Sequence, residues 1–97
     1  MTIDQLTADQ EVTLEVLIGG SSFEIKTEVV GTNDNTGVLL KPYVYNGMVV
    51  DFTAGSPKSM RFNLHCIDPL SGGRVVWKNV LVKLVNYRDV DYYVVDS

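Results

Sequence analysis

The chain has 97 residues, of which 45% are hydrophobic and 21% charged, and its net charge at pH 7 is −4. This length and composition predict one globular domain with a single core, and they exclude a disordered chain and, with only one cysteine, a disulfide scaffold. Because the apolar runs are too short for a transmembrane helix or a signal peptide and the basic residues are scattered, we predict a cytoplasmic protein with no membrane partner and disfavour a nucleic-acid partner.

The first eleven residues are mostly polar and contain one indication of helix. Thr7 is followed three residues later by Gln10, which is the spacing of a capping box. We therefore expect one short helical turn there and no helix elsewhere.

An antiparallel hairpin is predicted over residues 12–29. Apolar side chains alternate with polar ones through 12–18 and again through 23–29, which is the pattern of strands with one buried face. Gly19-Gly20-Ser21 between them is a turn sequence. A loop is expected at 31–37, where no apolar residue occurs.

A shorter hairpin should follow. A third strand is expected at 38–40, and Pro42 should end it or place it at a sheet edge. Asn46-Gly47, between 43–45 and 48–50, is the pair preferred for a type I′ turn, because both central residues of that turn have positive φ. Glycine and proline then predict a loop over 53–58.

The two longest predicted strands come last. Apolar and polar side chains alternate through 59–67, and residues 68–73 turn the chain back into the strand at 73–85. This strand contains the only tryptophan, Trp77, and is apolar on both faces over 81–85. We expect it to lie centrally, with the sheet on one face and another element or a partner on the other.

These elements predict an all-β fold: a small antiparallel β-barrel, split-barrel-like, with about six or seven strands and at most one short helical turn. An open barrel would expose a strand edge that can pair with a second copy, so a homodimer stays an open alternative. The expected core consists of large apolar residues on the buried faces of the strands: Trp77, Phe62, Leu64, Leu14, Val16 and Ile25.

No catalytic or metal site is predicted. His65 and Cys66 are the only histidine and cysteine, and as neighbours on a strand they point to opposite faces, so they cannot share one site. We expect a surface His65 and a structural Cys66. Residues 33–37 resemble a calcium loop only loosely, because Tyr43 stands where the closing glutamate is required. We therefore expect no enzymatic activity and neither a metal nor a cofactor on this chain.

The last residues are the strongest functional candidates. The chain ends at Ser97 directly after an apolar, aromatic run, although natural termini are usually polar. We expect residues 1–97 to form a single module, with 87–97 as a terminal strand or linker leading into a further domain. The side chains expected to contact that domain or another partner are Tyr87, Arg88, Tyr92, Tyr93, Val94 and Val95.

An alternative hypothesis uses the tyrosines as a stacking platform for single-stranded nucleic acid, as on an OB-fold. The residues concerned are Tyr43, Tyr45, Tyr87, Tyr92 and Tyr93. No basic groove accompanies them in the sequence, so we favour a protein interface.

The chain also resembles a known family. The order of its strands, the Arg-Val-Val-Trp block at 74–77 with the Val/Leu run behind it, and the terminal Tyr92-Tyr93-Val94-Val95 are similar to the N-terminal accessory (PilZN-type) domain of flagellar brake proteins, which are PilZ-type cyclic-di-GMP effectors. The resemblance covers most of the chain through diffuse patterning. It implies a non-catalytic regulatory domain that packs on a downstream PilZ domain. Such a domain helps to control flagellar motility through motor proteins, or surface-polysaccharide machinery.

The resemblance implies that cyclic di-GMP binds outside this chain. The family binds the nucleotide through an RxxxR motif at the linker and a D/NxSxxG motif on the PilZ barrel, and neither motif occurs here. Arg61, Arg74 and Arg88 are too far apart for the first, and Asp68 and Ser71 are three positions apart where the second requires two. We therefore expect cyclic di-GMP on a PilZ domain beyond Ser97.

Overall fold

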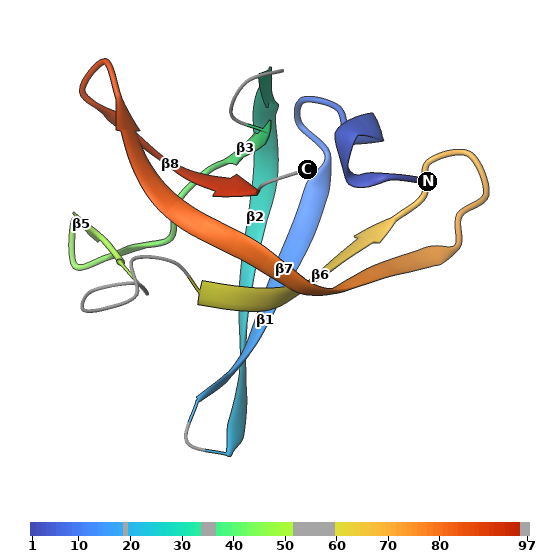
Figure 1. Cartoon of the computed structure of the whole chain (residues 1–97), viewed down its shortest axis with the longest axis horizontal. Helices are drawn as coiled ribbons and strands as arrows, with labels where there is room; N and C mark the ends of the chain where they lie inside the picture. Colours follow the sequence, from blue (N-terminus) through green and yellow to red (C-terminus); the bar gives the residue numbers. More distant parts are fainter. Residues whose placement is uncertain (19, 34–36, 52–59, 96–97) are drawn as a thin grey trace.

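The computed structural model describes residues 1–18, 20–33, 37–51 and 60–95, which form eight strands and one 3₁₀ turn, η1 (Ile3–Gln5). The strands are β1 (Glu11–Ile18), β2 (Ser21–Asn33), β3 (Gly37–Leu40), β4 (Val44–Tyr45), β5 (Met48–Val49), β6 (Met60–Ile67), β7 (Arg74–Tyr87) and β8 (Val90–Val95). Six of them close into an antiparallel barrel in the order β1-β2-β3-β8-β7-β6, while β4 and β5 form a separate two-stranded ribbon (Figure 1). The predicted all-β class, the antiparallel barrel and the single helical turn are confirmed.

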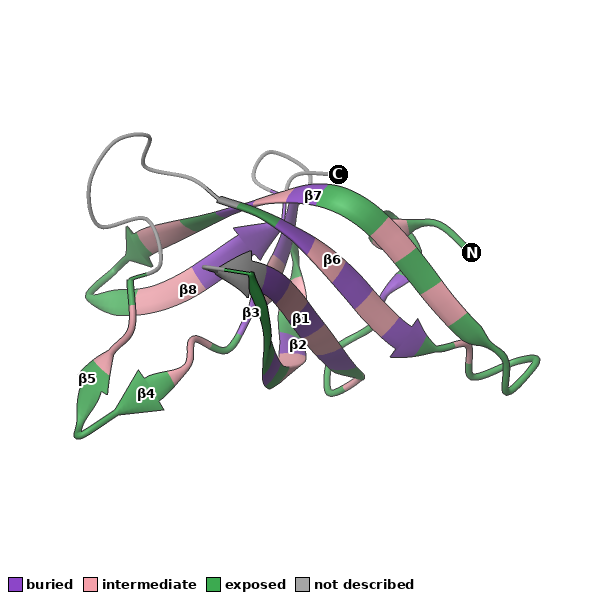
Figure 2. Ribbon diagram, turned by 90° about the horizontal axis from the view of Figure 1, so that it is seen from below, coloured by how far each residue is buried: buried purple, intermediate pink, exposed green. Residues whose placement is uncertain are grey.

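Buried apolar side chains from all six barrel strands form one core. Figure 2 marks the buried positions along the strands. Of the residues expected in the core, five are at most 5% exposed: Leu14, Val16, Ile25, Phe62 and Leu64. The sixth, Trp77, is half-buried and packs against them. Each fully buried side chain of this size contributes about 1.5–3 kcal/mol, so this interior is the main source of stability.

β1 and β2 form the predicted hairpin, with Glu11 opposite Glu28 at one end and Ile18 opposite Ser21 at the other. The prediction of a loop from residue 31 is wrong, because β2 continues to Asn33 and Gly37 already opens β3. A register shift in β2 just after residue 29 lets the strand bend and go on pairing with β3. A polar composition therefore does not end a strand whose backbone still has a partner. Gly19 and residues 34–36 lie outside the described residues.

The helical turn forms earlier in the chain than predicted. At η1, the Thr2 N–H donates to Gln5 Oε1 at 2.7 Å, with the same spacing that had pointed to a turn five residues later. The predicted contact between Thr7 and Gln10 also forms, since the Thr7 N–H donates to Gln10 Oε1 at 3.4 Å and the Gln10 N–H to the Thr7 carbonyl at 3.2 Å. These residues make a single turn and not a helix, because Asp9 has a φ of +70° and the segment is tied to β2. The Asp9 N–H donates to the Val29 carbonyl at 2.7 Å, and the Val29 N–H donates to the Gln10 carbonyl at 2.9 Å.

A β-bulge divides the long strand β7. Phe62 and Leu64 of β6 are two positions apart, whereas their partners on β7, Val80 and Trp77, are three apart. The extra residue is absorbed at Asn79, whose φ is +57°. Asparagine tolerates this left-handed region better than most residues do. The bulge moves the inward side of β7 from odd to even positions, so that Val80 points into the core.

β4 and β5 form the short hairpin predicted around Asn46-Gly47. Asn46 has a φ of +51° and Gly47 a φ of +76°, the positive values that a type I′ turn requires. The ribbon projects from the barrel (Figure 2), and the Tyr93 hydroxyl of β8 holds its base by donating to the Val50 carbonyl at 2.5 Å. The loop predicted at 53–58 and the first residue of the strand predicted at 59–67 lie outside the described residues.

Candidate functional site

The tail residues predicted to contact a partner lie on β8 and on the turn before it. Tyr93 and Val95 are 2% and 0% exposed and belong to the barrel core. Val94 points outward, between β3 and β7, but is only 6% exposed. These three side chains pack within the domain, because β8 closes the barrel, and they are not accessible to a neighbour. Of the six residues predicted to contact a partner, Tyr87, Arg88 and Tyr92 therefore remain as candidates.

Tyr87 and Arg88 lie at the β7–β8 turn. Tyr87 is opposite Val90, so the turn consists of Arg88 and Asp89, with φ values of +51° and +65°. Turns of this kind usually hold Asn-Gly, so two ordinary side chains are kept here in a conformation that costs energy. The Arg88 guanidinium lies 5.3 Å from the centroid of the Tyr87 ring, in a cation–π contact. The turn thus presents an aromatic ring and a cation together.

The outward-facing side of the β7–β8 hairpin is apolar. We call it the apolar outer face and define it by Leu81, Val85, Tyr87, Val90 and Tyr92. Tyr87 and Val90 are 55% and 47% exposed, and the other three are half-buried. Lys83 is the only charged residue among the outward-facing positions of 81–87 and 90–94. The cover expected over this side of β7 is therefore not supplied by the described residues.

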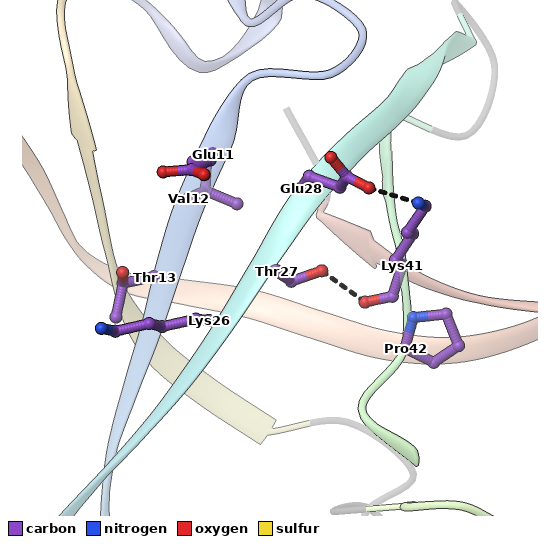
Figure 3. Close-up of a pocket in the computed structure, with 8 residues that line it drawn as sticks. All are labelled: Glu11, Val12, Thr13, Lys26, Thr27, Glu28, Lys41 and Pro42. Atoms are coloured by element: carbon purple, nitrogen blue, oxygen red, sulfur yellow. Dashed lines mark hydrogen bonds and ion pairs between the residues drawn. The ribbon is translucent and has the colours of Figure 1, made fainter.

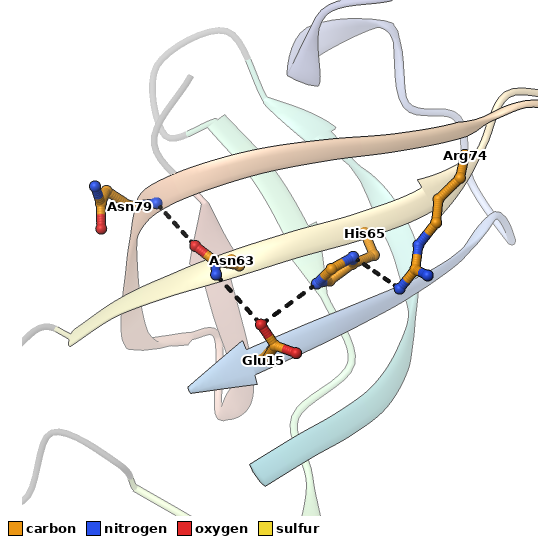
Figure 4. Close-up of polar contacts among 5 residues, drawn as sticks. All are labelled: Glu15, Asn63, His65, Arg74 and Asn79. Atoms are coloured by element: carbon orange, nitrogen blue, oxygen red, sulfur yellow. Dashed lines mark hydrogen bonds and ion pairs between the residues drawn. The ribbon is translucent and has the colours of Figure 1, made fainter. Parts of the chain in front are cut away.

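The outer side of β1 and β6 carries instead a polar network (Figure 4), which consists of Glu15, Asn63, His65, Arg74 and Asn79. The Asn63 amide nitrogen donates to Glu15 Oε1 and the Asn63 oxygen accepts from the Asn79 backbone N–H, both at 3.3 Å. An Arg74 N–H donates to His65 Nδ1 at 3.1 Å, so the neutral imidazole carries its proton on Nε2. That nitrogen is buried without a hydrogen bond, 3.8 Å from Glu15 Oε1.

His65 and Cys66 lie on opposite sides of β6, as predicted. His65 is on the outside, but its side chain is only 14% exposed because the polar network surrounds it, so the expected surface position is corrected to a largely covered one. Cys66 is buried, and this burial, followed by the nearby charge of Asp68, raises the pKa of its thiol. The thiol is therefore held in its protonated, less reactive form. Within the described ranges no group of three or more His, Cys, Asp or Glu residues could hold a metal ion.

A groove lies beside β1, β2 and the segment that follows β3 (Figure 3). In it the Lys41 ammonium is paired with the Glu28 carboxylate, and the Thr27 hydroxyl donates to the Lys41 backbone carbonyl at 2.5 Å. The hydrogen bond and the charge of Glu28 raise the pKa of Lys41. Glu11 and Lys26 line the same groove, so its charges are balanced. Sequence reasoning did not find this groove, because only the pairing of β2 with β3 brings Lys41 beside Glu28.

The fold and these surfaces define a small closed β-barrel with one polar and one apolar outer face. No family model, no curated protein and no solved structure matches this chain. None of the helical segments in the described part of the chain is long and apolar enough to cross a membrane. The function is therefore inferred from the surfaces of the barrel and from the family resemblance of the sequence.

Proposed function

We propose that this chain is a non-catalytic binding module, the N-terminal accessory barrel of a PilZ-type cyclic-di-GMP effector. The observation that carries this proposal is the apolar outer face, on which Tyr87 and Val90 are about half exposed. Contiguous apolar side chains at a surface mark places where another protein packs. The face lies on β7 and β8, the two strands that contain the 74–77 block and the terminal aromatic run of the resemblance.

The partner proposed for this face is a PilZ domain that follows in the same polypeptide. β8 carries part of the apolar outer face, so a domain that follows β8 would be joined to a strand of this face, and a short tether raises the effective concentration of the two surfaces. Tyr87 and Tyr92 are the proposed anchors, since tyrosine is enriched at the energetic centres of interfaces. Cyclic di-GMP bound to the PilZ domain would change this contact and so alter the control of flagellar motor proteins.

Calorimetric titration tests the location of the nucleotide site. Cyclic di-GMP is titrated into these 97 residues and, in parallel, into a protein extended through the following ~120 residues, about one further domain. We expect binding by the longer protein alone. Binding by the 97 residues alone would overturn the assignment of an accessory role, and no binding by either protein would remove the link to cyclic di-GMP.

A matched pair of variants in the longer protein tests the docking surface. Tyr87→Ser combined with Tyr92→Ser removes both proposed anchors, whereas Leu70→Ser changes a side chain that is 96% exposed in the β6–β7 turn. We expect the first variant to lose the compact arrangement of the two domains in small-angle scattering while keeping its nucleotide affinity. The Leu70 variant should behave as the parent does. An unchanged scattering profile for the tyrosine variant would contradict docking on this face.

The alternative function, an OB-like module that binds single-stranded nucleic acid, has less support. Tyr93 is buried in the core and cannot join a stacking platform. Tyr45 stands on the separate β4–β5 ribbon, whereas Tyr87 and Tyr92 stand on the β7–β8 hairpin of the barrel. The lysines of the groove are accompanied by carboxylates. Salt-dependent binding of labelled single strands would favour this alternative.

A further inference from the structure

The β4–β5 ribbon projects from the barrel and is largely exposed (Figure 2). Val44, Tyr45 and Met48 are 54%, 62% and 72% exposed. No charged residue occurs between Lys41 and Asp51. An uncharged, apolar projection of this kind is a candidate contact surface, and it is separate from the apolar outer face.

The ribbon is held in a defined position. Its type I′ turn sets the twist of the two strands, and the Val50 N–H donates to the Tyr43 carbonyl at 2.8 Å at the base. The buried Tyr93 of β8 donates its hydroxyl hydrogen bond to Val50. A two-stranded ribbon is nevertheless only marginally stable by itself and gains most from a third strand.

The alternation of an antiparallel ladder shows which backbone groups face outward. Tyr43 and Val50 form a hydrogen-bonded pair, so the next pair, Val44 and Val49, points its N–H and C=O groups away from the ribbon. On β4 this edge is interrupted by Pro42, which has no N–H to donate. On β5 the N–H of Val49 makes no hydrogen bond to another described residue. β5 is therefore the open edge of the ribbon.

The β1–β2 hairpin provides a comparison within the same chain. There β2 pairs with β3 only from Val29 onward. The part of β2 before Val29 pairs with β1 alone and so has one open edge. This part of β2 carries Glu24, Lys26 and Glu28, and charges protect an edge against pairing. The β5 edge has no such protection.

We propose that β5 pairs antiparallel with β5 of a second copy of this chain across a two-fold axis, which joins the two ribbons into a four-stranded sheet. A two-fold interface brings identical residues together, so it must be self-complementary. In a chain with a net charge of −4, contact between charged copies of one surface is unfavourable, and the uncharged ribbon avoids that repulsion. The inference does not depend on the proposed function.

Sedimentation velocity over protein concentrations from low micromolar to near millimolar tests the proposal. We expect the parent chain to shift from monomer to dimer. Met48→Lys places two lysines near the two-fold axis and should raise the dimer dissociation constant by about tenfold or more. Leu70→Lys, at the most exposed apolar residue outside the ribbon, should dimerise as the parent does. A parent chain that stays monomeric, or a Met48 variant that dimerises normally, would overturn the proposal.

Proline substitutions distinguish edge pairing from contact through side chains. Val49→Pro removes the outward N–H of β5 and should abolish the dimer, whereas Val44→Pro removes the corresponding group of β4 and should leave it intact. Circular dichroism confirms that both variants are folded. Equal dimerisation by both variants would rule out the β5 edge. A monomeric parent that instead cosediments with phosphatidylcholine vesicles would overturn the proposal in favour of a lipid partner.

Discussion

The two outer faces of this barrel differ in how their side chains are paired or covered. On the β1–β6 face, polar side chains bond to one another across three strands, from Glu15 through Asn63 to the Asn79 backbone. On the β7–β8 face, apolar side chains such as Tyr87 and Val90 stand about half exposed. Most polar groups of the first face are hydrogen-bonded within it, His65 Nε2 excepted, whereas the second face gains free energy when another surface covers it.

The β7 bulge explains how one strand contributes to both faces. Before the bulge the even-numbered Arg74 points outward into the polar network, and after it the odd-numbered Leu81 points outward beside Arg61. A strand without the bulge would keep one parity throughout, so Val80 and Val82 would point outward instead of into the core. The difference between the faces is therefore built into the backbone at Asn79 as well as into the side chains.

The largest effect is expected from neighbouring tyrosines on opposite sides of β8. Tyr93→Ser removes a ring from the core and should lower the free energy of unfolding by about 3–5 kcal/mol. Tyr92→Ser acts on the half-buried apolar outer face and should cost less than about 1 kcal/mol. Urea unfolding of the isolated chain measures both values. Equal costs would contradict the assignment of the two side chains to different faces.

The bulge itself gives the next largest effect. Asn79→Val puts a β-branched residue at a φ of +57° and should lower the free energy of unfolding by about 1–3 kcal/mol. Asn79→Gly keeps the backbone N–H and C=O of residue 79, which bond to the side chains of Asn63 and Arg61. It should change the free energy of unfolding by less than about 0.5 kcal/mol. The comparison is made by urea unfolding. If the two variants were equally stable, the strain at the bulge would be refuted.

A smaller effect is expected from the polar network. Asn63→Ala removes two hydrogen bonds, one to Glu15 and one from the Asn79 backbone, and should lower the free energy of unfolding by about 1–2 kcal/mol. Lys83→Ala, the matched surface change on the other face, should cost less than about 0.5 kcal/mol. The denaturant midpoints of the two variants provide the test. If Lys83→Ala lowered the stability more than Asn63→Ala, the stabilising role of the polar network would be contradicted.

The smallest effect should come from the β7–β8 turn and is stabilising. Asp89→Gly relieves a non-glycine residue at a φ of +65° and should raise the free energy of unfolding by about 0.5 kcal/mol. Gly47→Ala in the ribbon turn is the opposite change and should lower it by about 1 kcal/mol, because φ there is +76°. Thermal unfolding followed by circular dichroism detects both shifts. A destabilised Asp89 variant would show that the aspartate side chain has a role we have not assigned.

The candidate surfaces were only partly predictable from sequence. Tyr87, Arg88 and Tyr92 could be singled out because an aromatic run followed the longest strand pattern. The burial of Tyr93 and Val95 could not be foreseen, since it depends on β8 filling the gap between β3 and β7. The polar network was also missed, because its members are dispersed along the chain and meet only through the registers of β1, β6 and β7.

Local patterns in the sequence determined the all-β class, the type I′ turn at Asn46-Gly47 and the opposite orientation of His65 and Cys66. Each of these depends on neighbouring residues, whose side-chain alternation and φ preferences act without any distant contact. Tertiary structure alone decided that the barrel closes, that β2 continues through a polar segment and that β7 changes its inward side at Asn79. These outcomes depend on which distant strands pair and in which register, and that choice is made by the free energy of the whole core.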